Sequence, residues 1–245
     1  MHEAVHHSAV SDALTALACG SLDASANAAI EAANTRLSQA RSHLRDESAI
    51  AAQLSALLQS QGSAAADLRV RAWTIGATLA HAEASTFDAP VLAVAIAIGE
   101  ATGASEAAIA EAAAIGIEAA TRVLAAVDSS EFRARWNVAS SLGILGAVLA
   151  AARLYGLDAT RARHALGVAA TQAAGLAHND THAMRAIETG KAAADAIEAA
   201  LIAKHGFTSA PASIDGRRGL AALMAYRFDA ASIVDGVGSR WVSVQ

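Results

Sequence analysis

Cysteine, proline and aromatic residues are all scarce in this sequence. Among its 245 residues are one cysteine, two prolines and 4% aromatic residues. The single cysteine, Cys19, cannot form an intramolecular disulfide, which fits a reducing compartment. The first residues, Met1-His2-Glu3, lack the basic start and apolar run of a secretory signal. We therefore expect a cytoplasmic protein.

Positive charge and long apolar runs are lacking as well. The formal net charge is −5 and the Lys and Arg residues are scattered, so nucleic acid is not an expected partner. The longest apolar stretches, 89–99 and 138–152, fall short of the roughly 18–20 residues that span a bilayer. We expect them to be buried core helices, with no membrane segment.

Alanine is abundant throughout the sequence. Alanine is the strongest helix former and loses no side-chain entropy on burial, so the chain is predicted to be nearly all helix. Either Ser8 or Ser11 can cap the first helix, Ser105 and Asp158 are suited to cap later ones, and Gly206 is suited to end one. Helices are expected over 8–17, 24–44, 49–59, 65–84, 90–103, 105–127, 137–152, 160–174 and 183–205.

These signals predict one all-α domain across 1–245, with about eight to ten helices. The helix over 137–152 is rich in alanine on every side and should lie in the centre. The last stretch, 220–245, holds Gly, Ser and Asp at short spacing and is expected to be less regular.

Several motifs appear in order along the middle of the chain. They are W-N-V-A-S-S-L-G-I-L-G at 136–146, A-R-L-Y-G-L at 152–157, A-L-G-V-A-A-T-Q-A-A-G-L at 165–176, G-K-A-A at 190–193, H-G-F-T at 205–208 and I-D-G-R-R-G at 214–219. Together they resemble the helical domain of the 2-methylcitrate dehydratase (MmgE/PrpD) family. Residues 1–65 match that family only in helical character, and 237–242 resembles the crossing into its second domain.

The resemblance implies an all-α domain joined to a smaller α+β domain, usually in homodimers. Family members include dehydratases, a decarboxylase of a tricarboxylic acid and epimerases. They need no metal or organic cofactor, and their site lies between the two domains. Because the sequence stops soon after 242, we expect only the helical half here, as a homodimer, with or without a separate chain that supplies the second domain.

The family's acid–base positions are altered in this sequence. The paired aspartates expected after Ala80-His81-Ala82 are absent. Asn137 stands at the histidine of the W-H-P motif, and Arg185 and Glu188 stand at the K-x-x-H positions. Asn cannot exchange a proton near neutral pH and Arg stays protonated, so the family's ordinary residues cannot run its ordinary reaction here. The loss of charged positions fits a less charged substrate.

The segment His178-Asn179-Asp180-Thr181-His182 is the most suggestive local cluster. A carboxylate beside an imidazole makes a usable base, so His178, Asp180 and His182 are predicted to be catalytic, with Glu188 as a second acid or base. The alternative is a solvated polar loop that caps the next helix. No metal is expected, because a motif such as H-E-x-x-H is missing.

A second group is predicted to bind the substrate. Arg185 would bind a carboxylate or enolate, and Asn137 would donate a hydrogen bond beside Arg135 and Trp136, on an expected loop. The alternative is surface arginines next to a helix cap. His81 is either a further substrate contact or a packed core histidine.

The sequence thus predicts a cofactor-independent lyase or isomerase that acts on a small organic substrate by acid–base chemistry. Elimination, isomerisation and cyclisation all remain open. The alternative is a non-catalytic binding or scaffold subunit, or a half-enzyme that needs a separate α+β partner chain.

Overall fold

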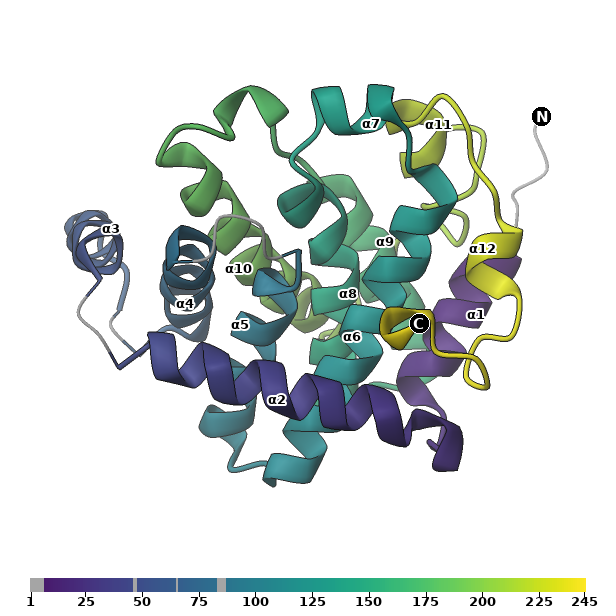
Figure 1. Cartoon of the computed structure of the whole chain (residues 1–245), viewed down its shortest axis with the longest axis horizontal. Helices are drawn as coiled ribbons and strands as arrows, with labels where there is room; N and C mark the ends of the chain where they lie inside the picture. The colour runs from purple at the N-terminus through teal and green to yellow at the C-terminus, as the bar shows by residue number, and fades with distance from the viewer. Residues whose placement is uncertain (1–6, 46–47, 65, 83–86) are drawn as a thin grey trace.

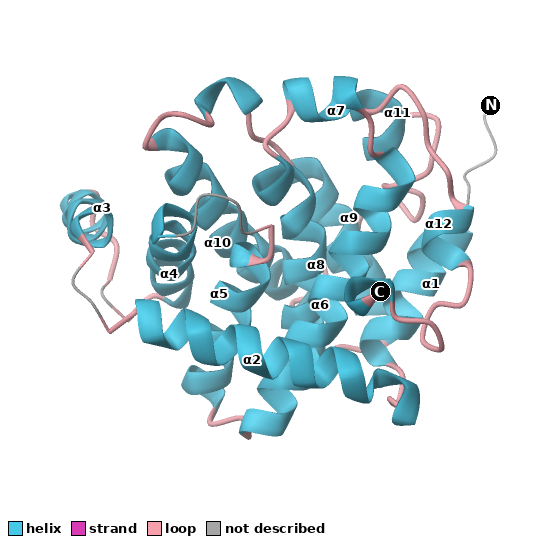
Figure 2. Ribbon diagram, in the orientation of Figure 1, coloured by secondary structure: helices cyan, strands magenta, loops and turns pink. Residues whose placement is uncertain are grey.

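The computed structural model describes residues 7–45, 48–64, 66–82 and 87–245, and within these ranges the chain is all-α (Figure 1). It has twelve α-helices and three short 3₁₀ helices there, and no strand (Figure 2). The α-helices are α1 Ala9–Cys19, α2 Asn27–His43, α3 Ala49–Ser60, α4 Leu68–Ala82, α5 Ala89–Thr102, α6 Glu106–Val127, α7 Ser130–Arg135, α8 Val138–Leu154, α9 Ala159–Gln172, α10 Met184–Lys204, α11 Leu220–Met224 and α12 Ala231–Val234. The 3₁₀ helices are η1 Ala24–Ala26, η2 Ala177–Asn179 and η3 Val242–Val244.

The predicted helix starts are confirmed by side-chain caps. Ser8 accepts a hydrogen bond from the Ser11 N–H, Ser105 from the Ala108 N–H, and Asp158 from the Arg161 N–H. These bonds satisfy N–H groups that have no partner within a helix.

Several expected boundaries differ from the structure, and α4 begins at Leu68 where a helix is expected from 65. Arg135, expected on a loop, is the last residue of the short helix α7, which begins where the Ser129 side chain accepts from the Phe132 N–H. The helix expected from 24 begins with the 3₁₀ turn η1, capped by Asp23, before α2 starts. Residues 65, 83 and 84 of the helix expected over 65–84 lie outside the described residues.

Helix α8 lies in the middle of the molecule, with α5, α6, α9 and α10 around it (Figure 1). Its residues 140–152 are all buried, as predicted for a helix that is apolar on every side. Residues 89–99 of α5 are buried as well. No helix in the described parts of the chain has the length and apolarity to cross a membrane.

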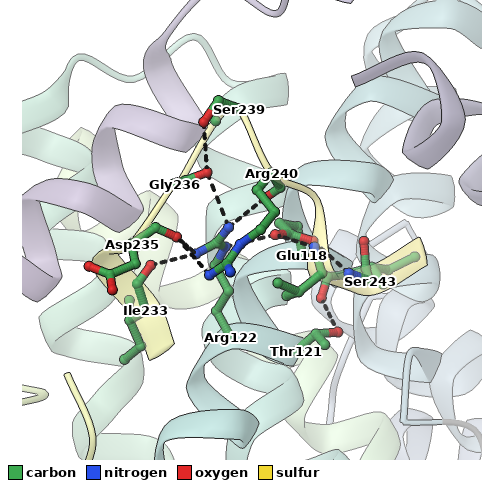
Figure 3. A network of polar contacts seen from close by, with 12 residues as sticks. Glu118, Thr121, Arg122, Ile233, Asp235, Gly236, Ser239, Arg240 and Ser243 are labelled. Atoms are coloured by element: carbon green, nitrogen blue, oxygen red, sulfur yellow. Dashed lines mark hydrogen bonds and ion pairs between the residues drawn. The ribbon is translucent and has the colours of Figure 1, made fainter. Parts of the chain in front are cut away.

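The less regular C-terminal stretch is attached to the core by hydrogen bonds between its backbone and a buried ion pair of α6 (Figure 3). Arg122 donates to Glu118 at 2.7 Å and to the carbonyls of Ile233 and Asp235 at 2.9 and 3.0 Å. Glu118 accepts from the N–H groups of Val242 and Ser243, at 3.0 and 2.9 Å. Both ionic side chains are buried, and each finds its hydrogen-bond partners in this stretch of backbone.

Candidate active site

The loop 173–183 lies against the start of α8. The Asn137 N–H donates to the Gly175 carbonyl at 3.2 Å, and Trp136 and Leu176 form an isolated antiparallel bridge. Gly175 has φ +130, and a Cβ there would lie 1.9 Å from Ser140 Oγ. Only glycine fits this close approach without strain, which explains the A-A-G-L motif in this part of the sequence.

A cavity of about 450 Å³ opens where this loop, α7, α8 and the start of α10 meet. One part of its wall is apolar and the other is polar. The described residues that line it are Ala80, Phe87, Leu124, Arg133, Trp136, Asn137, Val138, Ala139, Asp180, Arg185 and Thr189. Four residues predicted from the sequence therefore meet here: Trp136, Asn137, Asp180 and Arg185.

Asn137 is the N-cap of α8 and is 5% exposed. Its Oδ1 accepts from the Ala139 and Ser140 N–H groups at 3.1 and 3.4 Å. Its Nδ2 donates to Glu188 Oε1 at 2.8 Å and lies 3.4 Å from Thr189 Oγ1. Both the oxygen and the nitrogen of the Asn137 side chain, which is predicted to bind a substrate, are thus hydrogen-bonded within the protein.

Glu188 is half-buried and both of its oxygens are occupied. Oε1 accepts from Asn137, and Oε2 accepts from Asn179 Nδ2 at 3.0 Å. Glu188 is not among the described residues that line the cavity, but it is hydrogen-bonded to Asn137, which is one of them.

The charged groups of the cavity wall have opposite signs. Asp180 is exposed and is the one carboxylate among the described lining residues. Arg185 donates to the Ala80 carbonyl at 3.0 Å. Arg133 pairs with Asp128 through bonds of 2.6 and 3.0 Å, and the hydrogen bond to Asp128 raises the pKa of Arg133. The wall therefore offers a carboxylate and two guanidinium groups.

The predicted histidines lie outside this wall. His178 and His182 are exposed on the same loop as Asp180, and His182 Nδ1 is 3.2 Å from Thr181 Oγ1. His81 is exposed near the end of α4, so the alternative of a packed core histidine is wrong. Within the described ranges, no three His, Cys, Asp or Glu side chains are grouped closely enough to hold a metal ion.

Arg135 and Trp136 connect α7 to α11. The Met224 carbonyl accepts from Arg135 Nη2 at 2.7 Å and from Trp136 Nε1 at 3.1 Å. The Arg135 guanidinium also lies 4.6 Å from the centroid of the Tyr226 ring. The polar atoms of both residues thus bind the C-terminal stretch, while Trp136 also lines the cavity.

Comparison with models of known protein families shows to which family the chain belongs. The model described as the MmgE/PrpD N-terminal domain matches residues 64–232. The chain belongs to the MmgE/PrpD family. All described residues of the cavity wall fall inside the matched part of this MmgE/PrpD domain, whereas α1, α2 and α3 lie before it. Among curated proteins no match is found.

Sequence reasoning misses Asn179, Thr189 and the apolar wall. Asn179 stands inside the polar segment 178–182, but an amide exchanges no proton, so the sequence alone gives it no role. Phe87 and Leu124 reach the cavity from α5's N-terminal side and from α6, and no short motif links them to residues 136–189. Only the packing of the helices shows that they share a wall.

Proposed function

We propose that this chain is a divergent MmgE/PrpD lyase or isomerase that works on a small organic substrate without a cofactor. The observation that carries the proposal is the composition of the cavity wall, in which Asp180, Arg133 and Arg185 are joined by apolar residues such as Phe87 and Leu124. A positioned carboxylate can take a proton, and a fixed cation can stabilise the negative charge that develops.

In the proposed reaction, Asp180 removes a proton from a carbon next to a carbonyl or carboxylate group. The electron pair of the broken C–H bond passes into an enolate, which the Arg185 guanidinium stabilises. Return of a proton to carbon completes an isomerisation, and departure of a neighbouring group completes an elimination. The aromatic and aliphatic wall around Phe87 and Leu124 favours a substrate with an apolar part.

His178 and His182 have a different part in the proposal. Both are exposed on the loop that carries Asp180. A neutral imidazole has one nitrogen that donates and one that accepts a hydrogen bond, so these side chains are suited to pass the abstracted proton to water.

Proton abstraction can be tested before the full substrate is identified. A panel of small carboxylic acids and ketones is incubated with the protein in D₂O, and NMR follows replacement of the C–H proton by deuterium. We expect exchange for at least one compound, and a loss of at least about a hundredfold in Asp180→Asn. Asp235→Asn is the matched control, because the Asp235 side chain is exposed on the C-terminal stretch. Absence of exchange, or equal exchange in Asp180→Asn, contradicts the proposal.

A second candidate is a subunit that binds another protein chain, with or without a catalytic role. Four large apolar side chains are exposed on the loop, α10 and the C-terminal stretch: Leu176 (56%), Met184 (50%), Leu223 (73%) and Tyr226 (76%). Such side chains favour burial against a partner, either a second copy or a separate α+β chain. Sedimentation at increasing concentration tests for the homodimer, and Leu223→Ser with Tyr226→Ser is expected to weaken it. If the protein is a monomer at all concentrations, the second copy is excluded and the separate α+β chain is the partner that this candidate function requires.

A further inference from the structure

We infer that Glu188 is a positioning residue and that, with Asn137 and Asn179, it forms a clamp that holds Asp180 in the cavity wall. The inference rests on the proposed function of Asp180. It replaces the expected acid–base role of Glu188 and gives Asn179 a role that the sequence does not suggest.

The hydrogen bonds of Glu188 support this assignment. Its two oxygens accept from two amide groups, Asn137 Nδ2 at 2.8 Å and Asn179 Nδ2 at 3.0 Å. An ionised carboxylate accepts at both oxygens and donates nothing, so it matches two amide donors. Hydrogen bonds to an ionised group are also stronger than neutral ones. Glu188 is not among the described residues of the cavity wall, and both of its carboxylate oxygens are bonded within the protein.

The clamp joins three separate elements. Asn137 begins α8, Asn179 ends η2 and Glu188 lies in the first part of α10. Asn137 is itself fixed, because its Oδ1 caps α8. The position of Asn179 is therefore fixed relative to α8, whose residues 140–152 are all buried.

Asp180 follows Asn179 directly, so the clamp acts on it through the backbone. The Asp180 N–H donates to the Ala177 carbonyl at 3.0 Å, and the His182 N–H donates to the Asn179 carbonyl at 2.8 Å. The near end of the loop is held by the bond between Asn137 N–H and the Gly175 carbonyl. The bond between Asn179 and Glu188 attaches the loop a second time, on the C-terminal side of Leu176.

Amide hydrogen exchange of the whole chain tests the clamp without any substrate. Asn179→Ala removes one donor, and Glu188→Gln turns one accepting oxygen into an amide that faces a donor. We expect exchange at Asp180 and His182 to become about tenfold faster or more in each variant. Glu198→Gln is the matched control, since Glu198 is a half-buried glutamate of the same helix that contacts Arg69 and should leave this loop unchanged. Unchanged exchange at Asp180 in Asn179→Ala overturns the inference.

The deuterium assay then separates positioning from proton transfer. If the clamp positions Asp180, Asn179→Ala and Glu188→Gln lower kcat by similar factors with little change in KM, and the double variant is no worse than either single one. If Glu188→Gln loses as much activity as Asp180→Asn while Asn179→Ala keeps full activity, Glu188 transfers the proton and the inference is wrong. A wild-type protein without activity contradicts the proposed function alone, because the amide exchange still decides whether the clamp exists.

Discussion

Gly146 of α8 lies directly against the backbone of Gly116 of α6. A Cβ at Gly146 would be 2.1 Å from the Gly116 carbonyl oxygen, and a Cβ at Gly116 would be 2.8 Å from the Gly146 carbonyl oxygen. Gly190 of α10 has a similar place against α4, where a Cβ would lie 2.3 Å from the Trp73 carbonyl oxygen. Paired helices in this fold therefore approach at positions without a side chain, and the contact between Gly146 and Gly116 brings α6 close against α8.

Gly146→Ala should destabilise the protein strongly. The added methyl group meets backbone and not a flexible side chain, so the two helices must separate. We expect a loss of about 3 kcal/mol or more in the free energy of unfolding, measured by urea denaturation. Ala28→Ser, an exposed change of similar size on α2, should change it by less than about 0.5 kcal/mol. A Gly146→Ala protein as stable as the wild type would refute this packing.

Arg122→Met should release the C-terminal stretch. The change leaves Glu118 buried without its ionic partner and removes donors from the carbonyls of Ile233 and Asp235 (Figure 3). Loss of one partner of a buried ion pair costs about 3–5 kcal/mol. Urea denaturation measures the loss, and limited proteolysis should cut first within 233–244.

The pair Arg161–Asp158 is the matched control for that experiment. Its side chains are 53% and 54% exposed, so Arg161→Met should cost less than about 1 kcal/mol. Equal losses for the two substitutions would mean that burial of the Glu118–Arg122 pair has no influence on stability.

Asp88 should make the stability depend on pH. Burial raises the pKa of Asp88 above its ordinary value of 3.8, against the opposing effect of Arg36 at 2.9 Å. The folded state therefore holds this proton more tightly than the unfolded state. The stabilising contribution is present below pH 3.8 and is lost as the pH rises through the folded pKa.

Asp88→Asn tests this dependence. The neutral amide removes the cost of a buried charge, so the variant should gain stability relative to the wild type near pH 7, and the gain should shrink towards pH 3.8. Urea denaturation at a series of pH values measures the difference. A variant that is less stable than the wild type at pH 7 by a constant amount would show that the ion pair with Arg36 outweighs desolvation.

Asn137→Ala should destabilise the protein more than the loss of an ordinary helix cap. A missing cap costs about 1 kcal/mol, and the Glu188 carboxylate also loses a donor, so we expect about 2–4 kcal/mol in total. Asp158→Ala removes the exposed cap of α9 and should cost about 1 kcal/mol. Thermal unfolding of the two variants compares them, and equal shifts in Tm would contradict the second role of Asn137.

The sequence by itself determined the fold class and most helix boundaries. Alanine favours helix at nearly every position, and caps such as Ser105 and Asp158 act on N–H groups three residues away. These effects are local, so they act in the same way whatever the distant parts of the chain do. The ordered motifs between 136 and 219 also predicted the family, which the match over 64–232 confirms.

Only the tertiary structure decided which polar groups face the cavity. The sequence grouped His178, Asp180 and His182 because they are neighbours, yet the loop brings only Asp180 into the described wall. Asn137 and Glu188 are 51 positions apart, and Arg122 reaches carbonyls more than 100 positions away. The direction of each of these side chains depends on how helices distant in the sequence pack together. A local sequence pattern does not predict that packing.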